Sequence, residues 1–136
     1  MKDVMILDCT LRDGGYYNNW DFSKEIVNDY LKTMSAVSIN YVEVGFRSFQ
    51  SKDFKGPTWY TTDSYLESLN IPKNLNIGVM VNAFELISHS LGIEKSIKLM
   101  FKNKKESKVK FVRLACHFEE FDKTLKICKI LKSMGY

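Results

Sequence analysis

The sequence has few cysteines, few histidines and no long apolar run. Its three cysteines, Cys9, Cys116 and Cys128, lie far apart and form no C-x-x-C pair, which excludes a disulfide framework and a zinc knuckle. Thiols spaced in this way fit a reducing compartment, so we expect a cytoplasmic protein. No stretch approaches the ~18 apolar residues of a membrane span, and the apolar run at residues 4–7 is too short for a signal peptide.

The excess of basic charge is also small. Twenty Lys and Arg against 16 Asp and Glu give a net charge of +4 over 136 residues, which attracts anions only weakly. The densest basic run, at residues 102–110, has no aromatic residues between its lysines, although a base-stacking surface would need them. With 45% hydrophobic and 26% charged residues, the composition is that of one globular domain. We therefore expect no nucleic-acid partner and no membrane partner.

Short apolar runs recur along the chain and are rich in β-branched residues. They lie at residues 4–7, 41–46, 77–81 and 111–115, each bounded by polar residues or glycine, as is typical of strands. Apolar residues at helical spacing follow each run, and Ser23 is a plausible helix start. The helical sets are Ile26, Val27, Tyr30, Leu31 and Met34; Leu66 and Leu69; Ile93, Ile97 and Met100; and Leu125, Ile127, Cys128 and Leu131.

This alternation predicts four βα units in an α/β fold. Nearly continuous apolar strands indicate a parallel sheet covered by helices. Polar residues follow each predicted strand, at the end where the active sites of open α/β sheets and of (β/α)₈ barrels are found. Two arrangements fit the pattern. One is the first half of a barrel with strands in the order 1-2-3-4, and the other is a flavodoxin-like sheet with helices on both faces.

The first predicted strand runs into a polar segment, LDCTLRDGGYYNNWDFS, at residues 7–23. Asp8, Arg12 and Asp13 lie there beside two glycines, which let the backbone turn closely. Carboxylate oxygens suit Mg²⁺ or Mn²⁺, and a guanidinium suits a planar carboxylate or an enolate oxygen. The segment therefore indicates a metal and oxyanion site, and the alternative is a surface ion pair at a glycine turn.

Three segments of the chain resemble one enzyme family. The segment DCTLRDGG at residues 8–15 resembles the D-x-T-L-R-D-G signature that ends the first strand in the HMG-CoA lyase-like family, the DRE-TIM metallolyases. YVEVGF at residues 41–46 resembles that family's second strand. VRLACHFEE at residues 112–120 resembles V-R-V-A-T-H-C-T-E, the fourth-strand segment of 4-hydroxy-2-oxovalerate aldolases. This resemblance implies the N-terminal half, four βα units, of a TIM (β/α)₈ barrel.

The resemblance also implies roles for three residues. Arg12 would hold the oxo or enolate oxygen of a 2-oxo acid such as pyruvate, and Asp13 would bind a divalent metal, Mn²⁺ or Mg²⁺, with Zn²⁺ as an alternative. Glu43 would support Arg12 or the water shell of the metal. Such enzymes make or break a carbon–carbon bond through an enolate that fixed charges stabilise.

Two further positions carry a catalytic expectation. Where the aldolases place a base histidine three residues after the metal aspartate, this chain has Tyr16. A tyrosine, with a reference pKa of about 10, is a poor base near neutral pH but an acceptable proton donor or hydroxyl binder. His117 would either face the substrate at the end of the fourth strand or only hydrogen-bond a neighbouring loop.

Two arginines are candidates for substrate binding besides Arg12. Arg47 follows the second predicted strand, where it would form part of a substrate lid together with the aromatic residues of the long segment at 45–60. Arg113 lies within the fourth predicted strand and would point into the barrel. There it would pair with an acid such as Glu43, or bind an anionic substrate.

The chain supplies only part of such a barrel. The family has a His-x-His pair of metal ligands on a late strand, whereas this sequence has only His89 and His117, far apart. Four βα units in 136 residues are also about half of a barrel of about 250 residues. We therefore expect residues 1–136 to be a single partial barrel domain that stops before a fifth strand. Because the inward apolar side chains of the half-barrel would be uncovered, we also expect a homo-oligomer.

The expected function is that of the N-terminal part of a carbon–carbon lyase, inactive as a fragment. A catalytically inactive half-barrel that serves as a binding or assembly module is the alternative, because Tyr16 and the missing histidine pair allow it. Bacterial oxovalerate aldolases pass a product to a dehydrogenase, so the resemblance also allows a partner dehydrogenase.

Overall fold

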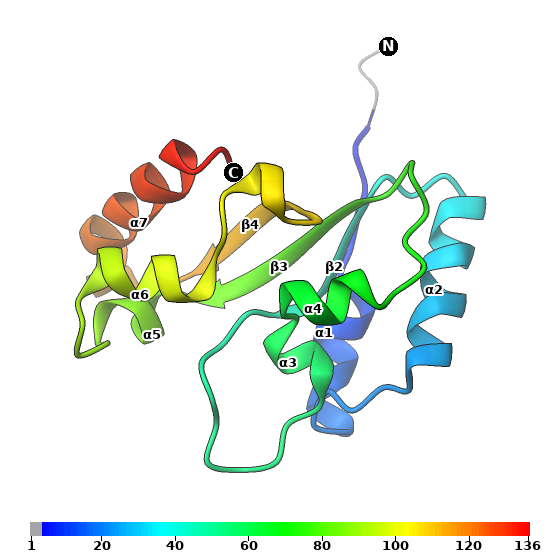
Figure 1. Cartoon of the computed structure of the whole chain (residues 1–136), viewed down its shortest axis with the longest axis horizontal. Coiled ribbons are helices and arrows are strands. Elements are labelled where there is room, and N and C mark those ends of the chain that lie inside the picture. Colours follow the sequence, from blue (N-terminus) through cyan, green and yellow to red (C-terminus); the bar gives the residue numbers. More distant parts are fainter. Residues whose placement is uncertain (1–3) are drawn as a thin grey trace.

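The computed structural model describes residues 4–136. Four strands form one sheet in the order β1-β2-β3-β4, and every neighbouring pair is parallel (Figure 1). The strands are β1 (Leu7–Asp8), β2 (Tyr41–Phe46), β3 (Asn76–Asn82) and β4 (Val109–Ala115). The helices are α1 (Thr10–Gly14), α2 (Lys24–Ala36), α3 (Pro57–Tyr60), α4 (Asp63–Glu67), α5 (Ala83–Ile87), α6 (Ile93–Met100) and α7 (Phe121–Ser133). Short 3₁₀ turns lie at Gly15–Tyr17, Lys104–Glu106 and Phe118–Glu120.

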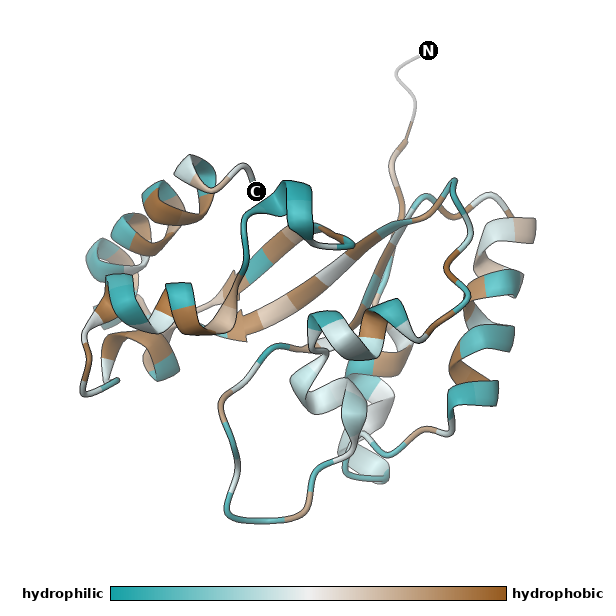
Figure 2. Cartoon of the chain, viewed as in Figure 1, coloured by the Kyte–Doolittle hydropathy of each residue, from teal (hydrophilic) through white to brown (hydrophobic). Residues whose placement is uncertain are grey.

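The helices pack against one face of the sheet. A single buried cluster joins alternate strand residues to the apolar sides of the helices. The strand members include Val42, Val44, Ile77, Val79, Val81 and Val109, and the helix members include Val27, Leu31, Leu66, Leu86, Ile97, Ile127 and Leu131. Figure 2 shows this pattern as apolar bands along the strands and as stripes on α2 and α7. One-sided helices and the unpermuted strand order confirm the half-barrel and exclude the flavodoxin-like alternative.

The predicted helix start at Ser23 is confirmed. Its hydroxyl accepts a hydrogen bond from the backbone N–H of Ile26 at 3.2 Å, which satisfies one of the free donors at the start of α2. Val27 and Leu31, one turn apart on α2, are fully buried against the sheet. The predicted helical spacing therefore places this helix on the outer face of the sheet.

The first predicted strand is much shorter than expected. We predicted a strand at residues 4–7, but β1 contains only Leu7 and Asp8, and Val4, Met5 and Ile6 are exposed. Within the described residues β1 pairs with β2 alone, so the segment lies at a free edge of the sheet. Apolar character was a poor guide here because it does not reveal whether a neighbouring strand is present.

The inward set of side chains also differs from the prediction. We expected apolar side chains of the predicted strands to line the barrel interior, but the buried strand valines face the helices. The inner face instead carries Tyr41, Glu43, Phe111 and Arg113, whose contacts lie on the opposite side of the sheet. The inner face of this half-barrel is therefore more polar than the sequence suggested.

A bulge in β2 sets the orientation of the residues that follow it. Glu43 pairs with Gly78 and Gly45 with Val79, so Val44 is an extra residue in the ladder. Phe46 pairs with Met80 on the inner face, and Gly45 faces the helices. A Cβ atom at Gly45 would lie 1.8 Å from the carbonyl oxygen of Thr58 in α3, so only glycine fits there.

A Gly45→Ala substitution should therefore destabilise the protein by about 1–3 kcal/mol, because α3 must move away from the strand. Gly14→Ala is the matched control, since its Cβ atom would meet only the ring of Phe22 at an ordinary 3.6 Å. Urea unfolding of both variants measures the difference. Equal stability of the two variants would contradict the close contact between β2 and α3.

Among residues 4–136, no helix combines the length and the apolar character needed to cross a bilayer.

Candidate active site at the inner face of the sheet

Glu43 is a fully buried carboxylate held between two arginines. Its Oε1 accepts hydrogen bonds from Nε of Arg12 at 2.8 Å and from Nη2 of Arg113 at 2.7 Å. Its Oε2 accepts from Nε of Arg113 at 2.8 Å. The geometry with Arg113 is bidentate, which is the stronger form of an arginine–carboxylate pair. The structure thus brings together three of the predicted site residues, which come from α1, β2 and β4.

The two arginines keep Glu43 ionised. Burial alone would raise the pKa of Glu43, but the hydrogen bonds from Arg113 and Arg12 outweigh it and lower the pKa below its ordinary value. Cys9 lies beside the same cluster, with its Sγ 3.9 Å from Nη2 of Arg113. Burial, together with the negative charge of Glu43, raises the pKa of this thiol. A raised pKa favours the neutral thiol, which fits a packing role for Cys9 better than that of a nucleophile.

The turn after β1 places Arg12 in the cluster. The N–H of Asp13 donates to the carbonyl of Cys9 at 2.9 Å, so α1 begins directly after the strand and presents Arg12 to the inner face. The indole N–H of Trp20 donates to the carbonyl of Arg12 at 2.9 Å. Trp20 lies against Gly15, where a Cβ atom would be 2.0 Å from its ring. The second glycine of the motif therefore makes room for the tryptophan that fixes the backbone of Arg12.

Inward side chains form layers below and above the charged cluster. Below it, the rings of Tyr41 and Phe111 meet at a centroid distance of 5.8 Å, and Phe111 occupies the space left by Gly78. Above it, near the carboxyl ends of the strands, Phe46 and Met80 pack with Trp20. The charged groups thus lie between two largely apolar layers, which is the layered arrangement of barrel interiors.

Tyr16 lies at the exposed rim of the upper layer. Its ring packs edge-on against Trp20, with the centroids 4.7 Å apart, and lies 6.5 Å from the ring of Phe46. The side chain is 65% exposed. Within the described residues no hydrogen bond occupies its hydroxyl group. This hydroxyl is therefore free to meet a ligand at the mouth of the half-barrel, the end formed by the carboxyl ends of the strands.

Asp13 is positioned less firmly than Arg12. Its carboxylate forms an ion pair with Nη1 of Arg12, and its side chain is 63% exposed. Over residues 4–136, no three His, Cys, Asp or Glu side chains lie close enough together to hold a metal ion. Asp13 can contribute one oxygen ligand, but the described residues alone do not make the metal site that the sequence suggested.

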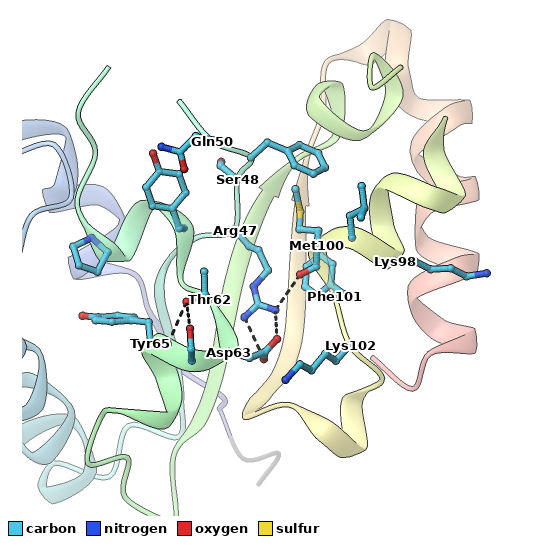
Figure 3. Close-up of a pocket in the computed structure, with 15 residues that line it drawn as sticks. Arg47, Ser48, Gln50, Thr62, Asp63, Tyr65, Lys98, Met100, Phe101 and Lys102 are labelled. Atoms are coloured by element: carbon cyan, nitrogen blue, oxygen red, sulfur yellow. Dashed lines mark hydrogen bonds and ion pairs between the residues drawn. The ribbon is translucent and has the colours of Figure 1, made fainter. Parts of the chain in front are cut away.

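Arg47 lies away from this cluster, on the helix side of the sheet (Figure 3). Its guanidinium donates to the carbonyl of Thr61 at 2.6 Å, to Asp63 at 3.2 Å and to the carbonyl of Met100 at 3.3 Å. The bulge at Val44 explains this placement. A regular strand would put residues 43 and 47 on the same face, and the extra residue reverses the second of them.

The contacts of Arg47 give it a clear structural role. The side chain is 3% exposed, ties α4 to the end of α6 and lines a cavity of about 620 Å³ between these helices. All of its partners are carbonyl or carboxylate oxygens of the fold itself. The structure therefore does not join Arg47 to the predicted substrate site, and its expected place in a lid stays a prediction.

His117 lies two residues beyond β4 and is exposed. Its backbone N–H donates to the carboxylate of Glu120 at 3.0 Å, and the backbone N–H of Glu120 donates to the carbonyl of His117 at 3.0 Å. These bonds start the turn before α7. No hydrogen bond among residues 4–136 joins His117 to the cluster of Arg12, Glu43 and Arg113, so its catalytic role stays a prediction.

Asp8, the first acid of the motif, faces α2 and not the mouth. Its carboxylate accepts hydrogen bonds from the hydroxyl of Tyr30 and from the N–H of Thr10, the latter at 2.9 Å. Burial would raise the pKa of Asp8, but these hydrogen bonds lower it. Asp8 thus anchors β1 to α2. The sequence did not indicate this role, because it does not show that Tyr30 lies beside Asp8.

Comparison with known proteins agrees with this architecture. No protein-family profile matches the chain. Over 82 residues it is 24% identical to the oxaloacetate decarboxylase of Mycobacterium tuberculosis, a match that covers 59% of this chain and 24% of that protein. It is 34% identical to a solved structure described as the N-terminal domain of a proposed aldolase from Bacteroides vulgatus, with a TM-score of 0.83.

The structural match covers 98% of this chain and 42% of the solved one. The chain therefore spans less than half the length of the proteins it matches. Its four parallel strands correspond to the N-terminal part of an aldolase domain, as half of a TIM barrel. The chain is related to aldolase and oxaloacetate decarboxylase proteins through this N-terminal part.

Proposed function

We propose that the chain is the N-terminal, oxyanion-holding half of an enzyme that makes or breaks a carbon–carbon bond next to the carbonyl of a 2-oxo acid. The observation that supports this most is the fixed position of Arg12. Its Nε is held by Glu43 at 2.8 Å and its carbonyl by Trp20 at 2.9 Å. Within residues 4–136 no hydrogen bond occupies its Nη2, which is free for a substrate oxygen.

The proposed chemistry follows from where the negative charge develops. When the bond next to the carbonyl breaks, its electron pair enters the new C=C bond and the carbonyl oxygen becomes an enolate. A fixed guanidinium stabilises this oxygen more strongly than the neutral carbonyl that precedes it, and so lowers the barrier. Loss of CO₂ from oxaloacetate leaves the enolate of pyruvate. Retro-aldol cleavage of a 4-hydroxy-2-oxo acid leaves the same enolate together with an aldehyde, and the 4-hydroxyl proton passes to water.

Tyr16 is the proposed proton donor in the cleavage direction. Its free hydroxyl lies at the rim next to Trp20, and a tyrosine hydroxyl is an acceptable proton donor. Transfer of that proton to the enolate carbon forms pyruvate, and water returns a proton to the tyrosinate. A divalent cation, Mn²⁺ or Mg²⁺, would provide further charge stabilisation, with Asp13 as one ligand and the others from outside residues 4–136.

Hydrogen–deuterium exchange of pyruvate tests the proposal. Enolate formation exchanges the methyl protons in D₂O, which NMR follows directly. We expect an Arg12→Ala variant to lose about 10²- to 10³-fold in exchange rate, the usual effect of removing one oxyanion donor. Lys110→Ala is the control, because Lys110 is an exposed cation on β4 outside the cluster.

The exchange is measured with Mn²⁺ and with Mg²⁺, on the 136-residue chain and on any longer polypeptide that contains it. Equal rates for the unaltered protein and Arg12→Ala would contradict the proposal. If no form of the unaltered protein exchanges pyruvate with either metal, the inactive binding or assembly module replaces the enzyme.

A further inference from the structure

We propose that Arg113 is the carboxylate-binding residue of this site, and that it holds the carboxylate of the 2-oxo acid whose oxo oxygen Arg12 holds. This inference rests on the proposed function and gives the two arginines different roles: Arg12 binds the oxo oxygen, and Arg113 binds the carboxylate. It assigns to the middle of β4 a substrate contact that the D-x-T-L-R-D-G motif does not contain.

The first support is that the two arginines share one oxygen. Nε of Arg12 and Nη2 of Arg113 both donate to Oε1 of Glu43, at 2.8 and 2.7 Å. Their guanidinium groups are therefore neighbours, held at a fixed separation by the carboxylate between them. A 2-oxo acid carries its carboxylate and its oxo oxygen on adjacent carbons, so it presents two adjacent acceptors to two adjacent donors.

The second support is that the guanidinium of Arg113 is accessible to a ligand. The side chain of Arg113 is 43% exposed, compared with 13% for Arg12. Glu43 occupies Nε and Nη2 of Arg113, and no hydrogen bond among the described residues occupies Nη1. Arg113 therefore has an unused donor on an accessible guanidinium, in the charge-assisted form that binds carboxylates most strongly.

The third support is the distribution of charge. Arg12 and Arg113 carry two positive charges, and Glu43 and Asp13 carry two negative charges, so the cluster is neutral as a whole. Asp13 forms its ion pair with Arg12, however, and among residues 4–136 Arg113 has no carboxylate partner that it does not share. The carboxylate of a 2-oxo acid would be a partner for Arg113 alone.

The fourth support is the shape of the inner face above β4. Ala115 lies two residues beyond Arg113 and so on the same face of the strand. Its small side chain packs beside the upper layer of Phe46 and Met80 and takes up less space over β4 than those two side chains take up over β2 and β3. Phe111 and Tyr41 close the layer below. A small carboxylate that enters from the mouth reaches Arg113 and cannot pass further.

Binding of pyruvate and of its neutral amide, pyruvamide, separates a carboxylate contact from a general one. Isothermal titration or NMR line broadening would give the dissociation constant of each compound for the unaltered chain, for Arg113→Met and for Arg113→Lys. We expect Arg113→Met to weaken pyruvate binding about 10- to 100-fold, the usual effect of losing a hydrogen bond to a charged group. Pyruvamide binding should change little.

Two further variants test whether the charge of Arg113 or its bidentate geometry matters. Arg113→Lys keeps the positive charge without the bidentate geometry and should restore part of the preference for pyruvate over pyruvamide. Lys110→Met removes a cation from the same strand and should change neither constant. Circular dichroism of each variant verifies that it is folded, and Arg113→Lys serves as the decisive variant if Arg113→Met does not fold.

The outcomes distinguish a carboxylate contact of Arg113 from a purely structural role. Unchanged pyruvate binding by a folded Arg113→Met variant would overturn this inference and leave the role of Arg12 intact. Equal loss of pyruvate and pyruvamide binding would also overturn it, because Arg113 would then act only by positioning Glu43. If the unaltered protein binds pyruvate no better than pyruvamide, the carboxylate contact is absent; if it also fails to exchange pyruvate, the proposed function fails with it.

Discussion

A Glu43→Gln substitution is expected to lower the free energy of unfolding by about 3–5 kcal/mol, the usual effect of removing one partner from a buried ion pair. Glutamine has nearly the same shape, so the effect comes from charge and not from a cavity. The variant leaves Arg12 and Arg113 facing each other without the carboxylate that separates them. Urea unfolding followed by circular dichroism measures the loss.

Two further variants test the cause of this effect. Glu94→Gln removes the same charge from an exposed i,i+4 pair with Lys98 on α6 and should leave stability unchanged within error. Arg113→Met combined with Glu43→Gln should recover part of the loss, because it removes one of the uncompensated charges. A Glu43→Gln variant as stable as the unaltered protein would show that the cluster is solvated and not buried.

The stability of the unaltered protein should also depend on pH through Glu43. Its pKa is lower in the folded state than in the unfolded chain, so the unfolded state binds the proton more readily as the pH falls. The contribution of Glu43 is therefore fully present above its ordinary pKa of about 4.5 and is lost as the pH falls through the lowered, folded value. Glu43→Gln should remove this part of the acid unfolding curve.

Self-association is the second large effect that we expect. Within residues 4–136, β1 and β4 each pair on one side only, so both edges of the sheet present free backbone groups. Exposed apolar side chains gather near the two edges, Met5 and Ile6 before β1 and Phe118 and Phe121 around the start of α7. The 136-residue chain should form pairs in which β4 of each copy meets β1 of the other, or aggregate.

Sedimentation equilibrium over a range of protein concentrations measures this association. Ile6→Lys places a charge beside the edge of β1 and should weaken the association. Val37→Lys alters an apolar residue of similar exposure at the end of α2, outside both edge strands, and should weaken the association less. A folded monomer of the unaltered chain at high micromolar concentration would contradict the prediction.

The order and type of the main elements could be predicted from the sequence. The spacing of apolar residues located β2, β3, β4 and the buried side of α2, because periodicity reports burial directly. It failed at residues 4–7, where the run is apolar but exposed. It also could not show which strand residues face the helices, because a fully buried strand is apolar on both sides and its period carries no direction.

The candidate site could be predicted in part. The motif and the second strand indicated Arg12 and Glu43, and the inward position of Arg113 followed from the fourth strand. Trp20 was missed because its contact with the carbonyl of Arg12 depends on a turn with positive backbone φ angles at Asn19 and Trp20, which no spacing rule reveals. Arg47 was predicted from its place after the second strand, and the sequence does not reveal the bulge that turns its side chain toward the helices.

The extra residue at Val44 also affects how this chain can vary. Deletion of Val44 would remove the bulge and leave Glu43, Phe46 and Arg47 on the faces that they occupy now, because Gly45 already pairs with Val79. A regular strand of the same length would instead turn Arg47 toward the mouth, deprive Asp63 of its partner and add a third cation beside Arg12 and Arg113. The bulge, and not the number of residues alone, therefore decides which charges meet at the inner face. Between chains of equal length in this strand, homologous positions beyond residue 44 are comparable in chemistry only where both chains have the bulge.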